Sequence, residues 1–558
     1  MYPDARTKTG FLDASTGKET GFLDVVSGLE PLTPFGKRLA SDIRPFMPGE
    51  EAALEAELDL LQGACAMLSG EAGAERVMDA MRGMKDISLT LGQCGGRVLS
   101  VVELFETKAL LLGMETLRGL CEGMGGAVPG GFAPEDMGGL LDALDPDGGR
   151  MPAFYIYDMF SVRLAELRRE RKGLDLLLRA GRKRLAAELL AASGISLGPR
   201  FETSIARSDE AALEAARSAP QLYTAGEDLF SVSFALSDDE EGRGLALRMD
   251  ALSLEIEDEE HEVRKALTAK VASEAARILE SCERVGRLDF LMAKARHALA
   301  NGCVRPAIPR GHTLRIEDGR HLGTERALRG RGLEYRPVSL SLGRGVACIT
   351  GANMGGKTVA VKMAGLVAAM AQHGFFVPCV SAAVGLSSSI SMLIGDSQDI
   401  GKGLSSFGGE IEGLRAALSG SGGRAMLLID EIAGSTNPSE GGALTKGLIA
   451  YLLKRPYICL MTTHFDGVAA MDGVVGYRTR GLSGTDPEAL AAALGEAKPG
   501  DRLRTLSGLM DYRLERTSGE AGIPRDAIRI AEILGLDREI VEFAKDSLDS
   551  AARRIQGH

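Results

Sequence analysis

The sequence predicts a mixed fold, in which a long helical region is followed by an α/β domain. Its 558 residues are enough for roughly three or four domains. From about residue 29 to residue 300, apolar residues recur at spacings of three and four, which is typical of amphipathic helices. From about residue 304 onward, short apolar runs alternate with helical segments, as expected of a parallel sheet with helices between its strands.

Two segments of the helical region, residues 158–190 and 252–300, are predicted to be unusually long helices. Helices of this length are typical of levers or coiled coils. Residues 191–250 lie between them and include the strand-like run DLFSVSFAL, which predicts a small tip joining two helical arms. Residues 1–28 are polar and rich in glycine and predict a flexible leader, in which the motif T-G-F-L-D occurs twice without an assigned function.

Three bounded apolar runs in the second half, GVACIT, AMLLID and YICLMTT, predict buried parallel strands. The first run is followed by GANMGGKT, Gly351 to Thr358, which matches the phosphate-binding pattern G-x-x-x-x-G-K-[ST] and opens a helical segment. Glycines such as Gly355 and Gly356 allow backbone N–H groups to turn towards phosphate oxygens, at the positive end of the helix. We expect Lys357 to reach the β- and γ-phosphates of ATP and Thr358 to bind Mg²⁺.

The second and third apolar runs end in polar residues that complete this chemistry. Asp430 ends AMLLID and is expected to hold Mg²⁺ directly or through water. Glu431 follows and is expected to act as the general base for the attacking water. His464, in TTHF after the third strand, is expected to sense the γ-phosphate through a hydrogen bond.

Composition restricts the class of protein. The net charge of −12 weakly opposes non-specific binding to nucleic acid or anionic membranes, although a local basic patch could still bind. The eight cysteines are scattered and form no C-x-x-C pair, which argues against a zinc site and for a reducing compartment. The N-terminus has no signal pattern, and no apolar run is long enough to span a membrane, so we expect a cytoplasmic protein.

Five segments of the second half occur in the order and spacing of the MutS ATPases: TGANMGGKT, GFFVPC, IGDSQDIGKGLSSFGGEI, LLIDEIAGSTNPSEGGAL and TTHF. The sequence resembles this family over nearly everything after residue 28. The resemblance implies a helical MutS core at residues 29–303, with lever helices and a clamp-like tip. It further implies an ABC-type ATPase domain at residues 304–510 and a C-terminal helical dimerisation segment at residues 511–558.

The resemblance also implies further site residues in a homodimer, where each nucleotide is covered by the partner's signature segment. Ser405 and Ser406 match the signature position that reaches the partner's γ-phosphate, and Asn353 matches the asparagine of the phosphate loop. Tyr335 lies where the family stacks an aromatic ring on adenine. Gln398, with Asp399 beside it, is expected near the nucleotide.

The sequence departs from MutS proper because it begins at the core, without space for the mismatch-reading and connector domains. STNPSEGGAL and GGKTVAVK are more similar to the second MutS branch, which acts in recombination control or ribosome rescue and ends in a Smr nuclease domain. The chain ends at His558, directly after the dimerisation segment. We therefore expect a truncated MutS-like protein that also lacks the Smr domain.

Two kinds of client remain open, and a ribosome-associated role is a weaker third. Family prevalence favours mismatched or branched duplex DNA. Residues 191–250, however, contain five Arg, no Lys and eleven acidic residues, which repel phosphates. Residues 163–184 contain nine Lys or Arg and three acids, and they could contact DNA or form a lever whose charges pair with Glu255 to Glu260. The truncated form resembles the reactivase subunit of a cobalamin-dependent lysine 5,6-aminomutase, which would make the client a protein.

Overall fold

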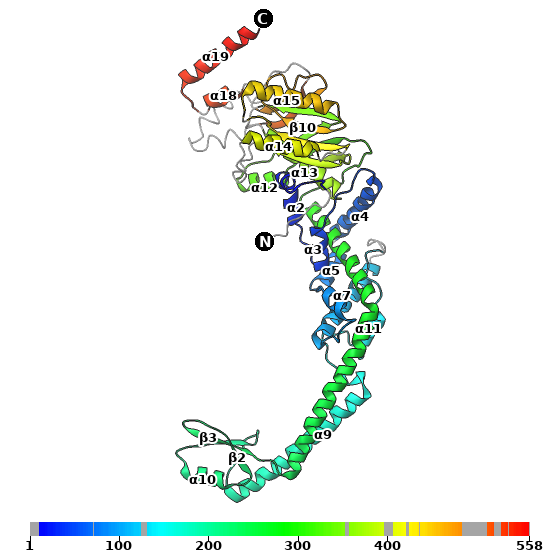
Figure 1. Cartoon of the computed structure of the whole chain (residues 1–558), viewed down its shortest axis with the longest axis vertical. Helices are drawn as coiled ribbons and strands as arrows, with labels where there is room; N and C mark the ends of the chain where they lie inside the picture. Colours follow the sequence, from blue (N-terminus) through cyan, green and yellow to red (C-terminus); the bar gives the residue numbers. More distant parts are fainter. Residues whose placement is uncertain are drawn as a thin grey trace. The chain divides into compact units, whose positions relative to one another are not determined.

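The computed structural model describes residues 10–70, 72–123, 131–351, 356–395, 406–419, 423–434, 436–481, 511–517, 526–533 and 535–556. The chain forms two compact units (Figure 1). Unit 1 comprises residues 1–83, 120–133 and 283–558, and unit 2 comprises residues 84–119 and 134–282. The predicted mixture of a helix-rich part and a multi-stranded sheet is confirmed.

A six-stranded sheet organises unit 1, in the order β12-β11-β6-β10-β9-β8. Every neighbouring pair is parallel except β11 and β12, which are antiparallel. The three predicted strands are present as β6, β9 and β10, side by side at the centre of the sheet. The strands are β6 Gly345–Thr350, β8 Ser389–Ile394, β9 Ala425–Asp430, β10 Ile458–Thr462, β11 Val474–Gly481 and β12 Asp511–Thr517.

Both faces of this sheet are buried, which explains why its strands are apolar throughout. Successive side chains of a strand point to opposite faces. Met426 and Leu428 of β9 pack in the core that contains helix α13 (Lys357–Gln372). Leu427 packs in a second core with Leu414 of α14 and Leu448 of α15; α14 is Ser406–Ser419 and α15 is Pro438–Leu453. Figure 1 shows these helices around β10.

Unit 1 also contains a three-stranded antiparallel sheet in the order β5-β4-β7. Its strands are β4 Leu314–Gly319, β5 Val338–Leu342 and β7 Ser381–Val384. The remaining helices of unit 1 are α1 Ala14–Glu19, α2 Phe22–Ser27, α3 Pro34–Ser41, α4 Glu51–Ser69, α5 Ala72–Met81, α12 Leu322–Gly330, α18 Asp526–Ile533 and α19 Arg538–Gln556. Strand β12 lies at the start of the predicted C-terminal helical segment, and that segment therefore begins as part of the sheet.

The expectation of a flexible leader does not hold for residues 10–28. Phe11, Leu12 and Phe22 are almost completely buried, and they belong to the same core as α13. The backbone N–H of Ile390 in β8 donates to the carbonyl oxygen of Phe11 at 2.8 Å. Apolar burial at long range therefore orders a segment whose local composition predicts flexibility.

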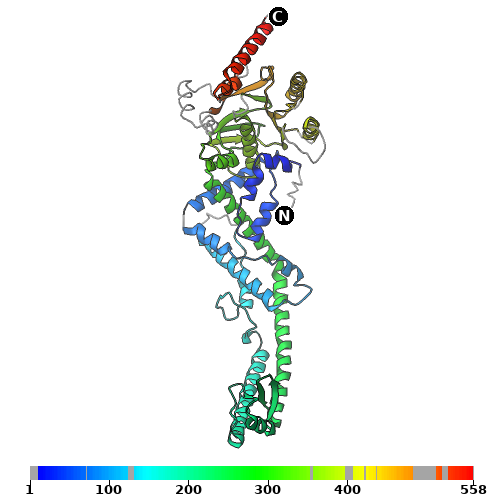
Figure 2. The ribbon, with the colours of Figure 1, turned by 90° about the vertical axis from the view of Figure 1, so that its left-hand side faces the viewer.

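Unit 2 is dominated by two long helices, which run side by side in both views (Figures 1 and 2). Helix α9 is Val162–Ser193, close to its predicted bounds. Helix α11 is Glu240–Ala300, begins 12 residues before the predicted residue 252, and continues into unit 1. Unit 2 also contains α6 Ser88–Gln93, most of α7 Val101–Gly123, α8 Gly138–Leu144, the 3-10 helix η1 Asp158–Phe160 and α10 Glu210–Ser218.

The predicted tip contains an antiparallel sheet in the order β1-β3-β2, so the helical region is not all-α. Its strands are β1 Glu202–Ala206, β2 Leu222–Glu227 and β3 Ser231–Leu236, and β3 lies in the predicted run DLFSVSFAL. Val232 and Phe234 of β3 pack against Leu213 of α10 in a small core. Among the described helices, none combines the length and the apolar character needed to cross a membrane.

Candidate nucleotide site

The carboxyl ends of β6, β9 and β10 lie together at one edge of the six-stranded sheet. Thr462 of β10 is aligned with Ile349 of β6 on one side and with Asp430 of β9 on the other. The phosphate loop therefore leaves the sheet beside the acidic residues that follow β9. Ligands of open α/β sheets bind at this edge.

Glycine is required at both described ends of the phosphate loop. Gly351 has φ +134°, and a Cβ atom there would lie 2.1 Å from the hydroxyl oxygen of Thr479. Gly356, at the N-cap of α13, has φ +76°, and its Cβ would lie 2.9 Å from the ring of Tyr512. Both angles lie in the left-handed region that favours glycine. The predicted residues Asn353 and Gly355 lie outside the described residues.

Lys357 is the first residue of α13, and its side chain is only 3% exposed. Its Nζ donates to the carbonyl oxygen of Gly351 at 3.0 Å and lies 3.0 Å from Oε1 of Glu431. A buried ammonium group needs such partners, because burial without them is strongly unfavourable. The predicted phosphate-binding lysine and the predicted general base therefore form an ion pair.

Thr358 and Asp430 are also brought together. The hydroxyl of Thr358 donates to Oδ2 of Asp430 at 2.7 Å, although the two residues are 72 positions apart in the sequence. A hydroxyl and a carboxylate are oxygen ligands of the kind that Mg²⁺ prefers. The donor set therefore fits the predicted metal.

The backbone turns sharply after Asp430. Glu431 has φ +53° and Ala433 has φ +60°, both in the left-handed region. Two side chains hold these residues: the hydroxyl of Thr462 accepts from the N–H of Glu431 at 3.0 Å, and Oε2 of Glu410 accepts from the N–H of Ala433 at 2.8 Å. Neither Thr462 nor Glu410 was predicted from the sequence, although Thr462 begins the motif TTHF and Glu410 lies in the motif IGDSQDIGKGLSSFGGEI.

His464 lies beside the same turn. Its side chain is exposed, and its ring centroid is 4.4 Å from that of Phe465. Its Cε1 atom lies 3.7 Å from the position that a Cβ on Gly434 would occupy. This placement is compatible with the predicted contact to the γ-phosphate, which stays a prediction.

The other residues that were predicted to contact the nucleotide are Gln398, Ser405, Ser406 and Tyr335. Ser406 begins α14, while Gln398 and Ser405 lie outside the described residues. The phenolic oxygen of Tyr335 accepts from the N–H of His321 at 3.0 Å, and burial raises the pKa of the phenol to about 12. Its stacking on adenine stays a prediction. Tyr512, which contacts Gly356, is an aromatic residue near the phosphate loop that the sequence analysis did not identify.

The basic stretch at residues 163–184 lies on α9, and ion pairs occupy much of its charge. Five of its nine cationic side chains have acidic partners: Arg163, Arg168, Arg179, Arg182 and Arg184. Arg163 pairs with Glu255 at 3.0 Å and Arg168 with Glu260 at 2.7 Å, as expected for a lever whose charges pair across the arms. Exposed pairs of this kind contribute little stability, but they reduce the positive charge available to phosphates.

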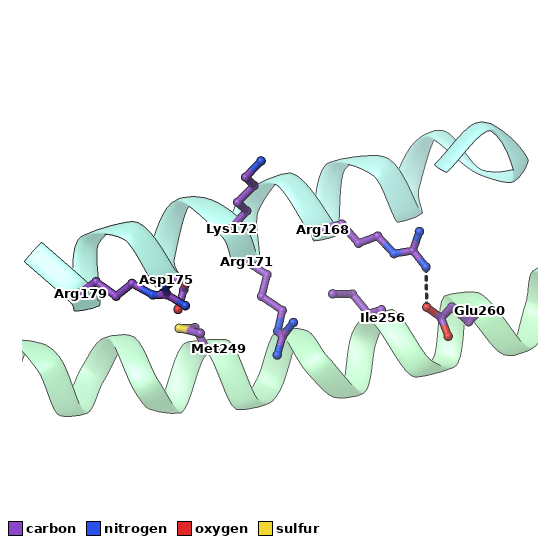
Figure 3. Close-up of a pocket in the computed structure, with 8 residues that line it drawn as sticks. All are labelled: Arg168, Arg171, Lys172, Asp175, Arg179, Met249, Ile256 and Glu260. Carbon is purple, nitrogen blue, oxygen red and sulfur yellow. Dashed lines mark hydrogen bonds and ion pairs between the residues drawn. The ribbon is translucent and has the colours of Figure 1, made fainter. Parts of the chain in front are cut away.

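Arg171 and Lys172 form no ion pair among the described residues, and they line a groove of about 560 Å³ between α9 and α11 (Figure 3). Arg171 extends towards α11, whereas Lys172 points away from it. The groove is lined by Arg168, Arg171, Lys172, Asp175, Arg179, Met249, Ile256 and Glu260.

The turn between β2 and β3 exposes two large apolar side chains. Leu229 is 87% exposed and Phe230 is 82% exposed. The carboxylate of Asp228 accepts from the N–H groups of Phe230 and Ser231, each at 2.7 Å, which fixes the shape of the turn. These two side chains form an exposed apolar patch on the tip.

Comparisons with known proteins agree with the motifs. The family model of MutS domain V matches residues 347–477, which include the phosphate loop, β9 and β10. Endonuclease MutS2 of Shouchella clausii is 30% identical over 304 residues, covering 53% of this chain and 34% of that protein. Endonuclease MutS2 of Symbiobacterium thermophilum is 35% identical over 217 residues, covering 38% of this chain and 26% of that protein.

A protein of the other branch is also similar. DNA mismatch repair protein MutS of Thermus thermophilus is 28% identical over 310 residues, covering 56% of this chain and 34% of that protein. The chain therefore spans about a third or less of the length of these curated relatives.

Proposed function

The chain belongs to the MutS family through its domain V, and we propose that it is an ATPase that couples the nucleotide cycle to conformational switching in a homodimer. The observation that carries this proposal is the convergence of Lys357, Thr358, Asp430 and Glu431 at one edge of the sheet. These side chains supply a phosphate-binding cation, metal-binding oxygens and a carboxylate base within hydrogen-bond distance of one another.

Each residue has a distinct role in the proposed reaction. Lys357 exchanges its ion pair with Glu431 for the β- and γ-phosphates when ATP binds. Glu431 is then available to accept the proton of the attacking water. Thr358 and Asp430 would hold Mg²⁺, which neutralises phosphate charge when bound.

The family resemblance and the surface of α19 support the proposed homodimer. Ile540 and Phe543 are 54% and 68% exposed, and Leu536, just before the helix, is 47% exposed. Positions i and i+3 of a helix lie on one face, so Ile540 and Phe543 form an apolar patch suited to a second copy. Ser405 and Ser406 of one protomer would complete the nucleotide site of its partner.

We propose mismatched or branched duplex DNA as the client, because the relatives' names refer to nuclease or DNA repair functions. Of the four cations of the basic stretch at residues 163–184 that form no ion pair among the described residues, Arg171 and Lys172 line the groove, and we take these two as the phosphate contacts. This contact predicts that DNA affinity falls steeply with salt concentration.

A protein client is the second candidate, and the exposed Leu229 and Phe230 favour it. The cobalamin-dependent lysine 5,6-aminomutase named with the family resemblance would be one such client. An acidic tip with two protruding apolar side chains fits a protein pocket better than a phosphate backbone.

Equilibrium titration tests the ATP part of the proposal. A fluorescent ATP analogue with Mg²⁺ should bind the wild-type chain, and Lys357→Ala should weaken this binding by roughly 100-fold or more, because it removes a buried charge from the phosphate site. Equal affinities of the two proteins would contradict the assigned site.

Duplex binding, measured with a non-hydrolysable ATP analogue at several salt concentrations, separates the two clients. Replacing both Arg171 and Lys172 with Ala should reduce the salt slope by about two, since each phosphate contact contributes roughly one. Arg182→Ala is the control, because Arg182 is already paired with Asp238. Absence of duplex binding at low salt would exclude DNA and leave the protein client.

A further inference from the structure

We infer that Thr462 is a positioning residue for ATP hydrolysis, which fixes the metal-binding carboxylate and the general base relative to each other. The inference rests on the proposed function, since it concerns the same reaction. Thr462 is the last residue of β10, between the strands that carry the phosphate loop and the acidic residues, and it is 1% exposed.

The hydroxyl of Thr462 makes two hydrogen bonds whose directions are fixed by its partners. It lies 3.0 Å from the backbone nitrogen of Glu431 and 2.7 Å from Oδ1 of Asp430. The N–H of Glu431 can only donate, so the oxygen of Thr462 accepts there. Its single proton is therefore donated to the carboxylate of Asp430.

Asp430 is consequently held at both oxygens by threonines. Thr358 donates to Oδ2 and Thr462 donates to Oδ1, each at 2.7 Å. One threonine comes from the helix that follows the phosphate loop, and the other comes from the neighbouring strand. These bonds fix the plane of the carboxylate and leave its remaining lone pairs free to face the metal position.

The same hydroxyl holds the backbone of Glu431 in a conformation that non-glycine residues seldom adopt. Glu431 has φ +53°, and its side chain reaches Nζ of Lys357 at 3.0 Å. A residue in this region is stable only when its surroundings impose the conformation, as at many functional sites. Without the hydroxyl of Thr462, the N–H of Glu431 loses its hydrogen-bond acceptor, and the carboxylate of Glu431 is no longer held in one orientation.

Positioning predicts a specific kinetic signature. The two hydrogen bonds of the Thr462 hydroxyl involve neither Lys357 nor the glycines of the phosphate loop, so its loss should leave the binding of ATP nearly unchanged. The alignment of the base and the metal ligand affects the chemical step, so loss of the Thr462 hydroxyl should lower kcat.

The test compares steady-state ATP hydrolysis and ATP-analogue binding in four forms of the full chain. Thr462→Val, which keeps the shape but removes the hydroxyl, should reduce kcat roughly 10- to 100-fold with KM within about threefold. Thr462→Ser, which keeps the hydroxyl, should restore most of the activity. Thr445→Val is the matched control beside the wild type, because Thr445 is also 1% exposed but its hydroxyl donates to the carbonyl oxygen of Gly441 within α15.

The outcomes distinguish the inference from the proposed function. A Thr462→Val variant as active as Thr445→Val, or a Thr462→Ser variant as slow as Thr462→Val, would overturn the positioning role. A wild-type chain without ATP turnover would instead overturn the proposed function, and the inference with it. If Thr462→Val fails to fold, Thr462→Cys supplies the comparison: its thiol is a weak donor of similar size, so its kcat should fall below that of Thr462→Ser.

Discussion

Gly351 and Lys357 show how closely the phosphate loop is fitted to its surroundings. The carbonyl oxygen of Gly351 accepts from the ammonium of Lys357, so the backbone at one end of the loop contacts the first residue of the following helix. Gly351 can adopt this position only because it has no Cβ atom, which would collide with Thr479. The backbone position of Gly351 thus depends on the missing Cβ atom as well as on the bond from Lys357.

Gly351→Ala should therefore weaken binding of an ATP analogue by at least about tenfold, because the strained φ and the collision together disfavour the binding conformation. Isothermal titration calorimetry measures this affinity. Gly343→Ala is the control, since no atom lies within 4 Å of the position of its added Cβ. Equal affinity in Gly351→Ala and Gly343→Ala would refute this account of the loop.

One buried histidine, directly after α13, packs against aromatic residues that precede α1 and begin α2. The ring of His373 stacks on Phe22 with centroids 4.4 Å apart and meets the edge of Phe11 at 5.6 Å. These phenylalanines are the aromatic residues of the two T-G-F-L-D copies. Burial lowers the pKa of His373 to about 4, so the ring is neutral in the folded protein at neutral pH.

This depressed pKa predicts that acid weakens unit 1. The unfolded chain binds a proton near pH 6.5, whereas the folded chain binds it only near pH 4. Stability is therefore complete above about pH 6.5 and decreases as the pH falls towards 4, by about 2 kcal/mol between pH 7 and pH 5. His373→Phe should reduce this loss, measured as the shift of the urea midpoint by circular dichroism. An unchanged shift would assign the acid sensitivity to other groups.

Elements with strong local patterns could be predicted from the sequence. The strands β6, β9 and β10 are short apolar runs, and α13 follows a glycine motif whose chemistry requires a strand and a helix on its two sides. Residues 10–28 could not be predicted, because two six-residue helices are stabilised by contacts with residues more than 300 positions away, such as Met392, whose N–H donates to the hydroxyl of Thr16. The start of α11 was missed because Glu240 to Asp250 contain five charged residues and two glycines, so their local pattern does not favour a helix.

The residues of the candidate site also divide into those that a local motif predicts and those that it does not. Lys357, Thr358, Asp430 and Glu431 were predicted because each stands in a motif at a strand end or helix start. Thr462 and Glu410 were not, because their roles depend on which backbone N–H groups they meet across the sheet. Their hydrogen bonds result from strand register and from the left-handed turn after Asp430, neither of which is encoded in a local pattern.

At the scale of the whole molecule, the proposed dimer depends on the apolar patch of α19. Replacing both Ile540 and Phe543 with Glu should convert the dimer to a monomer, because two buried charges in an apolar interface are strongly unfavourable. Analytical ultracentrifugation measures the mass. The monomer should also lose ATP turnover, since the partner's Ser405 and Ser406 would be absent.

Glu539→Lys is the control for this experiment, because Glu539 is an exposed, charged residue of the same helix that does not belong to the patch. It should sediment like the wild-type chain. A dimer that persists in the Ile540→Glu and Phe543→Glu double variant would place the interface elsewhere.

We propose above that Glu431 activates water at a site built for ATP. Steady-state phosphate release by the wild-type chain and by Glu431→Gln, with ATP and Mg²⁺, tests it most directly. We expect turnover by the wild-type chain and a loss of roughly 100-fold or more in Glu431→Gln, which should still bind ATP because Lys357 and the glycines of the phosphate loop are unchanged. Equal turnover by the two proteins, or no turnover by the wild-type chain, would contradict this role of Glu431.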